Sequence, residues 1–202
     1  MNTGICLEEI DLSAEMSAKT FLAIQNNLHN NKVVVLKKQD ISDEQYLNFA
    51  LKFGAIFHSG NNPVLGKDGN ETKIVVVGNQ AKEYKNSYLG HQEVLPHSDH
   101  QWVLNPSSVS MLYAIDVEPG ASPTTWTNMA AAFATLDEDL KDQIKNVKTV
   151  TYNPFFRPFG TVSAKYVNRN IDIPPGEIFE HPLVRTHPIT QEKMLYICLL
   201  YT

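Results

Sequence analysis

Hydrophobic residues in the first part of the chain recur at helical spacing and then form a short continuous run. Apolar side chains at positions 16, 21, 22, 24 and 28 predict a helix over residues 13–29, with Ser13 as its cap. Residues 33–36 read Val-Val-Val-Leu, which is typical of a short buried strand. The chain therefore opens with a helix followed by a strand.

A second helix is marked by its ends. Ser42 and Gln45 form a capping-box pattern, and Tyr46, Phe49 and Phe53 follow on one helical face. A glycine then stands at position 54, where a helix C-terminal cap is common. We expect this helix to end close to that glycine.

The remainder of the chain is rich in β-branched residues separated by loop sequences. We expect one further helix pair, over 128–133 and 137–146, and strands over 74–77, 109–117, 147–152 and 193–201. Helices at the front and strands joined by long loops favour an α+β fold with an antiparallel core.

Composition narrows the function. The 202 residues carry 17 Lys and Arg against 22 Asp and Glu, a net charge of −5. Without a basic run, we expect neither a nucleic acid nor an anionic membrane as partner. We see no secretory signal and no bilayer-spanning run, and the two cysteines, Cys6 and Cys198, fit a reducing cytoplasm. We expect one domain over 1–202, and its apolar C-terminal residues favour a homo-oligomer.

The residues most suggestive of chemistry are His97 and Asp99, within the sequence LPHSDH at 95–100. If this segment is a strand, the two side chains share one face. An imidazole and a carboxylate are two of the three ligands of a 2-His-1-carboxylate site for non-heme Fe(II). Taken alone, the triplet is also typical of a polar surface turn.

Several motifs around this triplet resemble the TauD/TfdA family of Fe(II)- and 2-oxoglutarate-dependent dioxygenases. The resemblance covers roughly residues 30–202. Its elements are the Phe53-Gly54 helix end, the His-Ser-Asp triplet, the loop at 120–124, the Trp126, Asn128 and Met129 positions of a helix start, and the sequence HPLVRTHP at 181–188.

The resemblance implies a fold and a set of site residues. The fold would be a double-stranded β-helix (a cupin-like jelly roll) with flanking N-terminal helices, incomplete at the C-terminus. His97 and Asp99 match the first two iron ligands, Thr124 matches the threonine that contacts 2-oxoglutarate, and His58 is a candidate for substrate binding. The cofactors would be Fe(II) and the cosubstrate 2-oxoglutarate, with O2 and a small-molecule substrate.

Other family positions are absent or altered. The family's third iron ligand and its cosubstrate arginine fall beyond Thr202, and we interpret His181 and His187 as structural or substrate-proximal. Arg185 is interpreted as a structural ion pair. Gln191 replaces a glycine common in the turn before the last strand, so we expect strain there if that turn needs a positive φ.

The hypothesis is thus an enzyme that hydroxylates an unactivated C–H bond while decarboxylating 2-oxoglutarate to succinate, with impaired activity in this chain alone. Two alternatives stay open. One is a noncatalytic remnant or interaction module with an incomplete metal site. The other is a hydrolytic or cupin-like metal protein that uses His91, His97 and His100.

Overall fold

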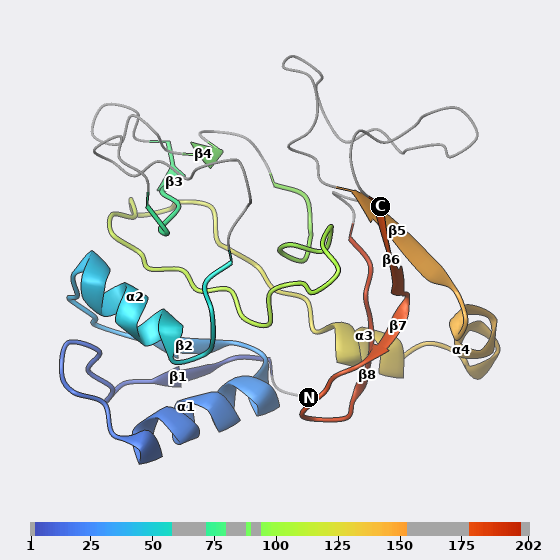
Figure 1. Ribbon diagram of the computed structural model, residues 1–202, viewed down its shortest axis with the longest axis horizontal. Helices are drawn as coiled ribbons and strands as arrows, with labels where there is room; N and C mark the ends of the chain where they lie inside the picture. The colour runs from blue at the N-terminus through green and yellow to red at the C-terminus, as the bar shows by residue number, and fades with distance from the viewer. Residues whose placement is uncertain (1–2, 58–71, 80–87, 90–93, 153–177, 199–202) are drawn as a thin grey trace. The chain divides into compact units, whose positions relative to one another are not determined.

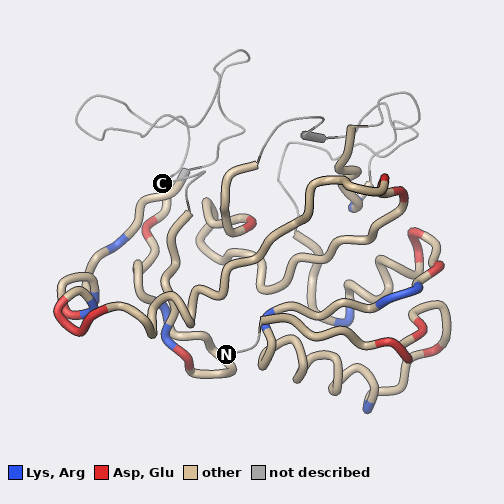
Figure 2. Tube along the Cα trace, turned by 180° about the vertical axis from the view of Figure 1, so that it is seen from behind, with Lys and Arg blue, Asp and Glu red and all other residues tan. Residues whose placement is uncertain are grey.

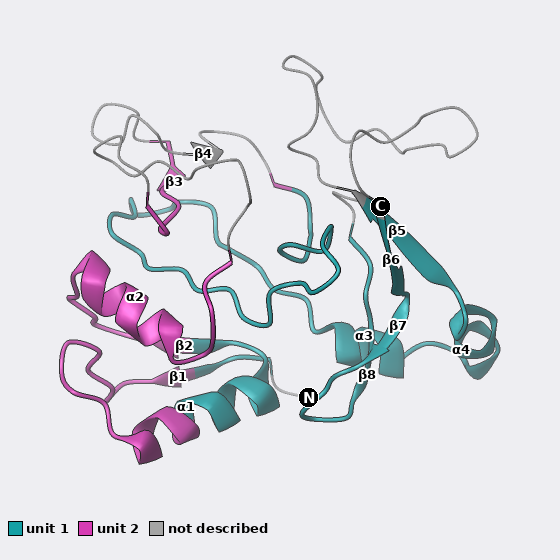
Figure 3. Ribbon diagram, in the orientation of Figure 1, with its two compact units in different colours: residues 1–5, 24–34, 95–202 teal, residues 6–23, 35–94 magenta. Residues whose placement is uncertain are grey.

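A computed structural model describes residues 3–57, 72–79, 88–89, 94–152 and 178–198 (Figure 1). The chain groups into two compact units, shown in Figure 3. One unit comprises residues 1–5, 24–34 and 95–202, and the other comprises residues 6–23 and 35–94.

The expected N-terminal helix and strand are present, together with an earlier strand that the sequence did not predict. Strand β1 (Ile5–Leu7) pairs with β2 (Val34–Leu36), and helix α1 (Ala18–Asn31) lies between them in sequence. The expected cap at Ser13 is wrong, because Ser13 is bonded to the Asp11 carboxylate instead. The Ser17 hydroxyl accepts from the Thr20 amide at 3.1 Å, so it satisfies one of the free N–H groups at the helix start.

Helix α2 (Asp43–Leu51) begins where the capping box predicts. The Ser42 hydroxyl accepts from the Gln45 amide at 3.2 Å, and the Gln45 side chain accepts from the Ser42 amide at 2.8 Å. The Phe53 ring makes edge contacts with Phe49 and Phe21, at centroid distances of 5.5 and 5.0 Å. Gly54 follows with φ of +140°, a conformation that an L side chain rarely adopts.

The middle of the chain has less strand than its sequence predicts. The run at 74–77 contributes only to β3 (Val77–Gly78), which pairs in parallel with β4 (Tyr88–Leu89). The expected strand at 109–117 is irregular. Its burial still alternates from Val109 to Tyr113, but a strand also needs a hydrogen-bonding neighbour, and none pairs with this segment among the described residues.

Two short helices and four strands follow. Helix α3 (Met129–Ala134) is capped by the Asn128 side chain. Helix α4 (Glu138–Ile144) has acidic residues in its first turn and a basic residue in its last turn (Figure 2). Strand β5 (Lys148–Tyr152) pairs antiparallel with β6 (Ile178–Pro182), and β7 (Val184–Thr186) pairs antiparallel with β8 (Lys193–Leu195).

The antiparallel pairs agree with the predicted antiparallel core, although every sheet in the described chain has two strands. The C-terminal strand is shorter than the expected 193–201 range, of which 199–201 lie outside the described residues. Gln191 has φ of +60° in the turn between β7 and β8, so this turn does need a positive φ, a conformation that favours glycine.

Close to the β5–β6 pair, the first unit buries both polar and apolar side chains. Trp102 packs with Cys198 and Val103, and Gln101 and Thr151 are fully buried. Three of these residues, Gln101, Trp102 and Val103, follow the His-Ser-Asp triplet with only His100 between. The cluster therefore anchors the turn that carries the candidate metal ligands.

Candidate metal centre

The structure brings His97 and Asp99 together at the surface of one unit. The imidazole Nε2 lies 3.1 Å from the Asp99 Oδ1, and the two side chains are 28% and 43% exposed. The backbone around them is irregular and turns at residues 99–102, so the strand geometry considered for this triplet does not apply. The two side chains converge because a turn, and not a strand, directs them to one point.

A second contact fixes the orientation of the His97 ring. Its Nδ1 lies 2.8 Å from the Leu95 carbonyl oxygen. A carbonyl only accepts hydrogen bonds, so Nδ1 carries the proton and the neutral ring presents a lone pair at Nε2. That lone pair faces a carboxylate oxygen, which is also an acceptor. Only a proton or a metal cation between the two atoms makes this arrangement favourable.

Without a metal, a proton on Nε2 would make the contact a hydrogen bond. The hydrogen bond from His97 lowers the pKa of Asp99 to about 2, with help from Ser110 and against the effect of burial. The same hydrogen bond to Asp99 is the main cause that raises the pKa of His97 above its usual value. A proton on Nε2 and a metal cation would therefore compete for the same position between the two side chains.

The geometry also fits a divalent metal. Two ligand atoms that bind at about 2.1 Å and at a right angle lie about 3.0 Å apart. The observed separation of 3.1 Å between Nε2 and Oδ1 is close to this value. The contact between Nδ1 and a backbone carbonyl is the usual support for a metal-binding histidine. Both side chains are partly exposed, so further ligands have access.

The second oxygen of Asp99 is held by a residue that sequence reasoning missed. The Ser110 hydroxyl donates a hydrogen bond to Asp99 Oδ2. Ser110 lies 11 positions along the chain, in the segment expected to be a strand, and no local pattern singles it out. Both oxygens of Asp99 are thus oriented by neighbours.

His100 points to a different set of partners. Its Nδ1 lies 2.5 Å from the Ser107 hydroxyl, and its ring makes an edge contact with Trp102. Burial lowers the pKa of this imidazole. His91, the other member of the alternative histidine cluster, lies outside the described residues. Within the described ranges, no group of three His, Cys, Asp or Glu side chains is placed to hold a metal.

The histidines of the 181–188 motif are engaged in local structure. His181 is buried, and its Nε2 lies 2.8 Å from the Gln101 carbonyl oxygen. His187 Nδ1 accepts from the amides of Ile189 and Thr190, at 3.2 and 3.1 Å. Neither lies beside Asp99 in the contacts of the described chain, which agrees with their interpretation as structural residues.

The remaining motif positions have clear surroundings. The Arg185 guanidinium lies 4.4 Å from the centre of the Tyr196 ring, a cation–π contact where we expected an ion pair. Thr124 is exposed in the irregular segment between the Gly120 turn and α3, and in the described chain no hydrogen bond joins it to His97 or Asp99. His58 lies outside the described residues. The roles of Thr124 and His58 stay predictions.

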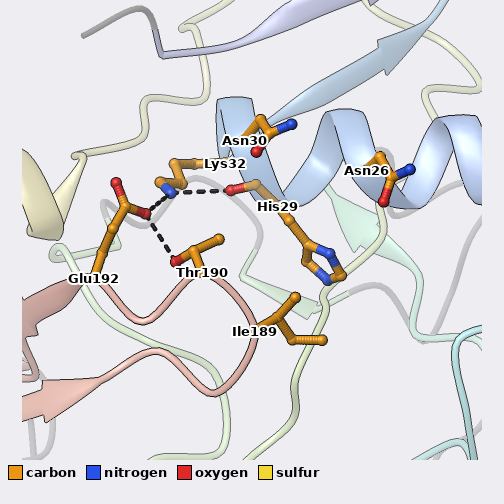
Figure 4. Close-up of a pocket in the computed structure, with 7 residues that line it drawn as sticks. All are labelled: Asn26, His29, Asn30, Lys32, Ile189, Thr190 and Glu192. Carbon is orange, nitrogen blue, oxygen red and sulfur yellow. Dashed lines mark hydrogen bonds and ion pairs between the residues drawn. The ribbon is translucent and has the colours of Figure 1, made fainter.

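Figure 4 shows a separate polar cavity of about 370 Å³ near the end of α1. The Lys32 ammonium donates to both the His29 carbonyl and the Glu192 carboxylate, and Thr190 donates to the same carboxylate. Charges in the cavity are therefore already paired. The other lining residues are Asn26, Asn30 and Ile189.

Comparison with known proteins shows the family of this chain. A family model described as "Taurine catabolism dioxygenase TauD, TfdA family" matches residues 2–201. The chain belongs to the TauD/TfdA family. This TauD/TfdA chain is 26% identical over 212 residues to an alpha-ketoglutarate-dependent 2,4-dichlorophenoxyacetate dioxygenase of Cupriavidus pinatubonensis, covering 95% of the chain and 68% of that relative.

Other relatives have similar names. An alpha-ketoglutarate-dependent sulfate ester dioxygenase of Pseudomonas putida is 26% identical, with 96% of this chain and 62% of the relative covered. The TauD/TfdA chain thus spans about 62–68% of the length of these two curated relatives.

Solved structures show the shared fold. The crystal structure of AAD-2 in complex with Mn(II) and N-oxalylglycine matches with a TM-score of 0.72 and 27% identity, covering all of this chain and 71% of that one. A taurine dioxygenase from Burkholderia xenovorans matches with a TM-score of 0.59 and 21% identity, covering 99% of this chain and 62% of that one. The ligands in the first structure are a divalent metal and an analogue of 2-oxoglutarate.

Within the described ranges, none of the helices has the length and apolar character that crossing a bilayer requires.

Proposed function

We propose that this chain carries the metal-binding turn of an Fe(II)- and 2-oxoglutarate-dependent dioxygenase, with His97 and Asp99 as two of the protein ligands. The observation that carries the proposal is the facing pair itself. His97 Nε2 and Asp99 Oδ1 lie 3.1 Å apart, while Nδ1 is tied to the Leu95 carbonyl. Family membership supports the identity of the metal and of the cosubstrate.

Held by these residues, Fe(II) and 2-oxoglutarate would supply the oxidative chemistry, in which decarboxylation to succinate and reduction of O2 accompany hydroxylation of an unactivated C–H bond. The protein's own residues bind and orient. The Leu95 carbonyl holds the His97 tautomer, and Ser110 holds the Asp99 carboxylate. Thr124 would bind a 2-oxoglutarate carboxylate through its hydroxyl, and His58 would contact the small-molecule substrate.

We propose that the fold is a jelly roll with N-terminal helices outside it, and that residues 1–202 belong to one domain of this kind. The likeness to AAD-2 over the full chain and the antiparallel β5–β6 and β7–β8 pairs support this. The family match over residues 2–201 supports the single domain. A cytoplasmic location and a homo-oligomer stay predictions from the sequence.

We also propose that residues 1–202 alone turn over 2-oxoglutarate poorly. In the described part of the chain only two candidate ligands meet at the site, and the relatives named above are longer. Each missing protein ligand leaves an exchangeable water on the metal, so both metal and cosubstrate bind less tightly.

The test is Fe(II)-dependent succinate formation by residues 1–202 and by a longer form that includes the family's C-terminal part. We expect activity in the longer form, its loss on His97→Ala, and weak turnover by the shorter chain. A longer form with no succinate formation, but with a stable fold, would favour the noncatalytic module instead.

A further inference from the structure

The peptide that follows the metal pair is held from an unexpected side. The backbone carbonyl of Gln101 accepts two side-chain hydrogen bonds, from Thr151 Oγ1 at 2.9 Å and from His181 Nε2 at 2.8 Å. Both donors are buried, with 0% exposure at Thr151 and 4% at His181. A carbonyl has two acceptor positions, so this one is saturated by protein groups.

The two donors come from paired strands. Thr151 lies on β5 and His181 on β6, and these strands pair antiparallel over five residues each. A paired ladder holds its side chains rigidly. The Gln101 carbonyl is therefore fixed relative to the β5–β6 sheet.

Gln101 is held at two more points. Its side-chain Nε2 donates to the Tyr196 carbonyl at 3.3 Å, and its neighbour Trp102 packs against Cys198. Only His100 separates Gln101 from Asp99, and His100 has φ of +57°, in the left-handed region. Such a conformation persists only where its surroundings impose it.

We propose that Thr151 and His181 are positioning residues for the metal pair, acting through the Gln101 carbonyl. By fixing this peptide they set the direction in which the turn presents Asp99 to His97. The proposal rests on the proposed function, because it concerns the same metal pair. It assigns a role to the first histidine of the 181–188 motif and to a threonine that no motif marks.

The chain offers a matched control for Thr151. Thr149 lies two residues earlier on the same strand, is also buried, and donates its hydroxyl to the His181 carbonyl at 3.3 Å. Its bond stays within the β5–β6 pair and does not reach Gln101. Replacing Thr149 by valine removes a hydrogen bond within the β5–β6 pair, whereas replacing Thr151 by valine removes the bond to Gln101 and a longer bond, of 3.3 Å, to the Phe179 carbonyl. Both changes keep the side-chain volume nearly constant, so the Thr149 variant controls for the loss of a bond inside the strand pair.

The experiment measures Mn(II) affinity by the disappearance of the free-ion electron paramagnetic resonance signal, for the full chain and its variants. We expect Thr151→Val to weaken binding about five- to tenfold, which is about 1–1.4 kcal/mol, and Thr149→Val to change it less than about twofold. Thr151→Ser, which keeps the hydroxyl, should restore the affinity. In the same way, His181→Gln should bind more tightly than His181→Leu.

A second readout needs no metal. In the metal-free chain, amide hydrogen exchange over residues 99–103 should be faster in Thr151→Val than in Thr149→Val. Equal losses of affinity in the two valine variants, or no loss in either, would overturn the positioning role. If the parent chain binds Mn(II) no better than Asp99→Ala, the proposed function fails. The positioning role is then decided by hydrogen exchange alone: faster exchange in Thr151→Val than in Thr149→Val supports it, and equal exchange overturns it.

Discussion

Ser110→Ala tests whether the support of Asp99 matters to the metal site. The Ser110 hydroxyl donates to Asp99 Oδ2, whereas Oδ1 faces His97. Removing the hydroxyl frees the carboxylate to rotate, so Oδ1 is no longer held toward the metal position. Partners of this kind orient metal-binding carboxylates, and their loss commonly weakens metal binding.

The size of the effect follows from exposure. A hydrogen bond to a charged group contributes about 1.5–3 kcal/mol. The Asp99 side chain is 43% exposed, so water replaces part of the lost bond. About 1 kcal/mol should remain, which corresponds to about a fivefold weaker Kd for Mn(II). Protonation of Asp99 adds little to this change near neutral pH, because the pKa of Asp99 is about 2 and rises only toward its usual value without Ser110.

Isothermal titration calorimetry with Mn(II) measures this change, and Ser108→Ala provides the control. Ser108 is an exposed serine in the same irregular segment, two residues before Ser110. The Ser108→Ala variant should bind Mn(II) with the same affinity as the parent chain. The reasoning is wrong if Ser110→Ala binds within about twofold of the parent, or if Ser108→Ala loses as much affinity.

Two further predictions concern stability. The pKa of His187 is lowered, chiefly by burial, and its Nδ1 accepts hydrogen bonds from two backbone amides. The unfolded chain therefore binds a proton at this histidine near the usual pKa of about 6.5, whereas the folded chain binds it only at lower pH. The free energy of unfolding should therefore fall as pH drops below about 6.5. Urea unfolding at about pH 7.5 and 5.5 should show a smaller fall in His187→Asn than in the parent chain, and an equal fall in both would contradict the assignment. Gly54→Ala places an L side chain at φ of +140° and should lower the free energy of unfolding by about 1–2 kcal/mol. Gly78 has no positive φ, so Gly78→Ala should lower it by under about 0.5 kcal/mol in the same assay.

Helices were predictable because their signals are local. The Ser42 capping box and the Asn128 helix start are short patterns whose hydrogen bonds close within three residues. The prediction of a helix cap at Ser13 is wrong because a different local hydrogen bond competes with it. Asp11 lies two residues before it and binds its amide and hydroxyl more directly than a helix start would.

Strands were predicted less well because each needs a distant partner. Residues 109–117 carry a strand-like alternation, yet in the described chain no neighbour pairs with them. By contrast, residues 147–152 form β5 because β6 lies beside them, although about 30 residues separate the two in sequence. Composition of a segment does not reveal whether its partner is present.

The candidate site shows the same division. His97 and Asp99 could be found from a short motif, and their family resemblance gave that motif meaning. Ser110, Thr151 and His181 support the site from 11, 50 and 80 residues away from their partners, and only folding brings them there. Sequence reasoning identified the candidate ligands and missed the residues that orient them.

The most direct test of the central claim is Mn(II) binding by the chain and by two variants, His97→Ala and Asp99→Ala, measured by electron paramagnetic resonance. The account predicts that the parent chain binds one Mn(II) and that each variant loses at least about tenfold in affinity, since each removes one of two protein ligands. His100→Ala serves as comparison, because the His100 ring bonds to Ser107 and makes its edge contact with Trp102. Binding that survives in both His97→Ala and Asp99→Ala would contradict the account.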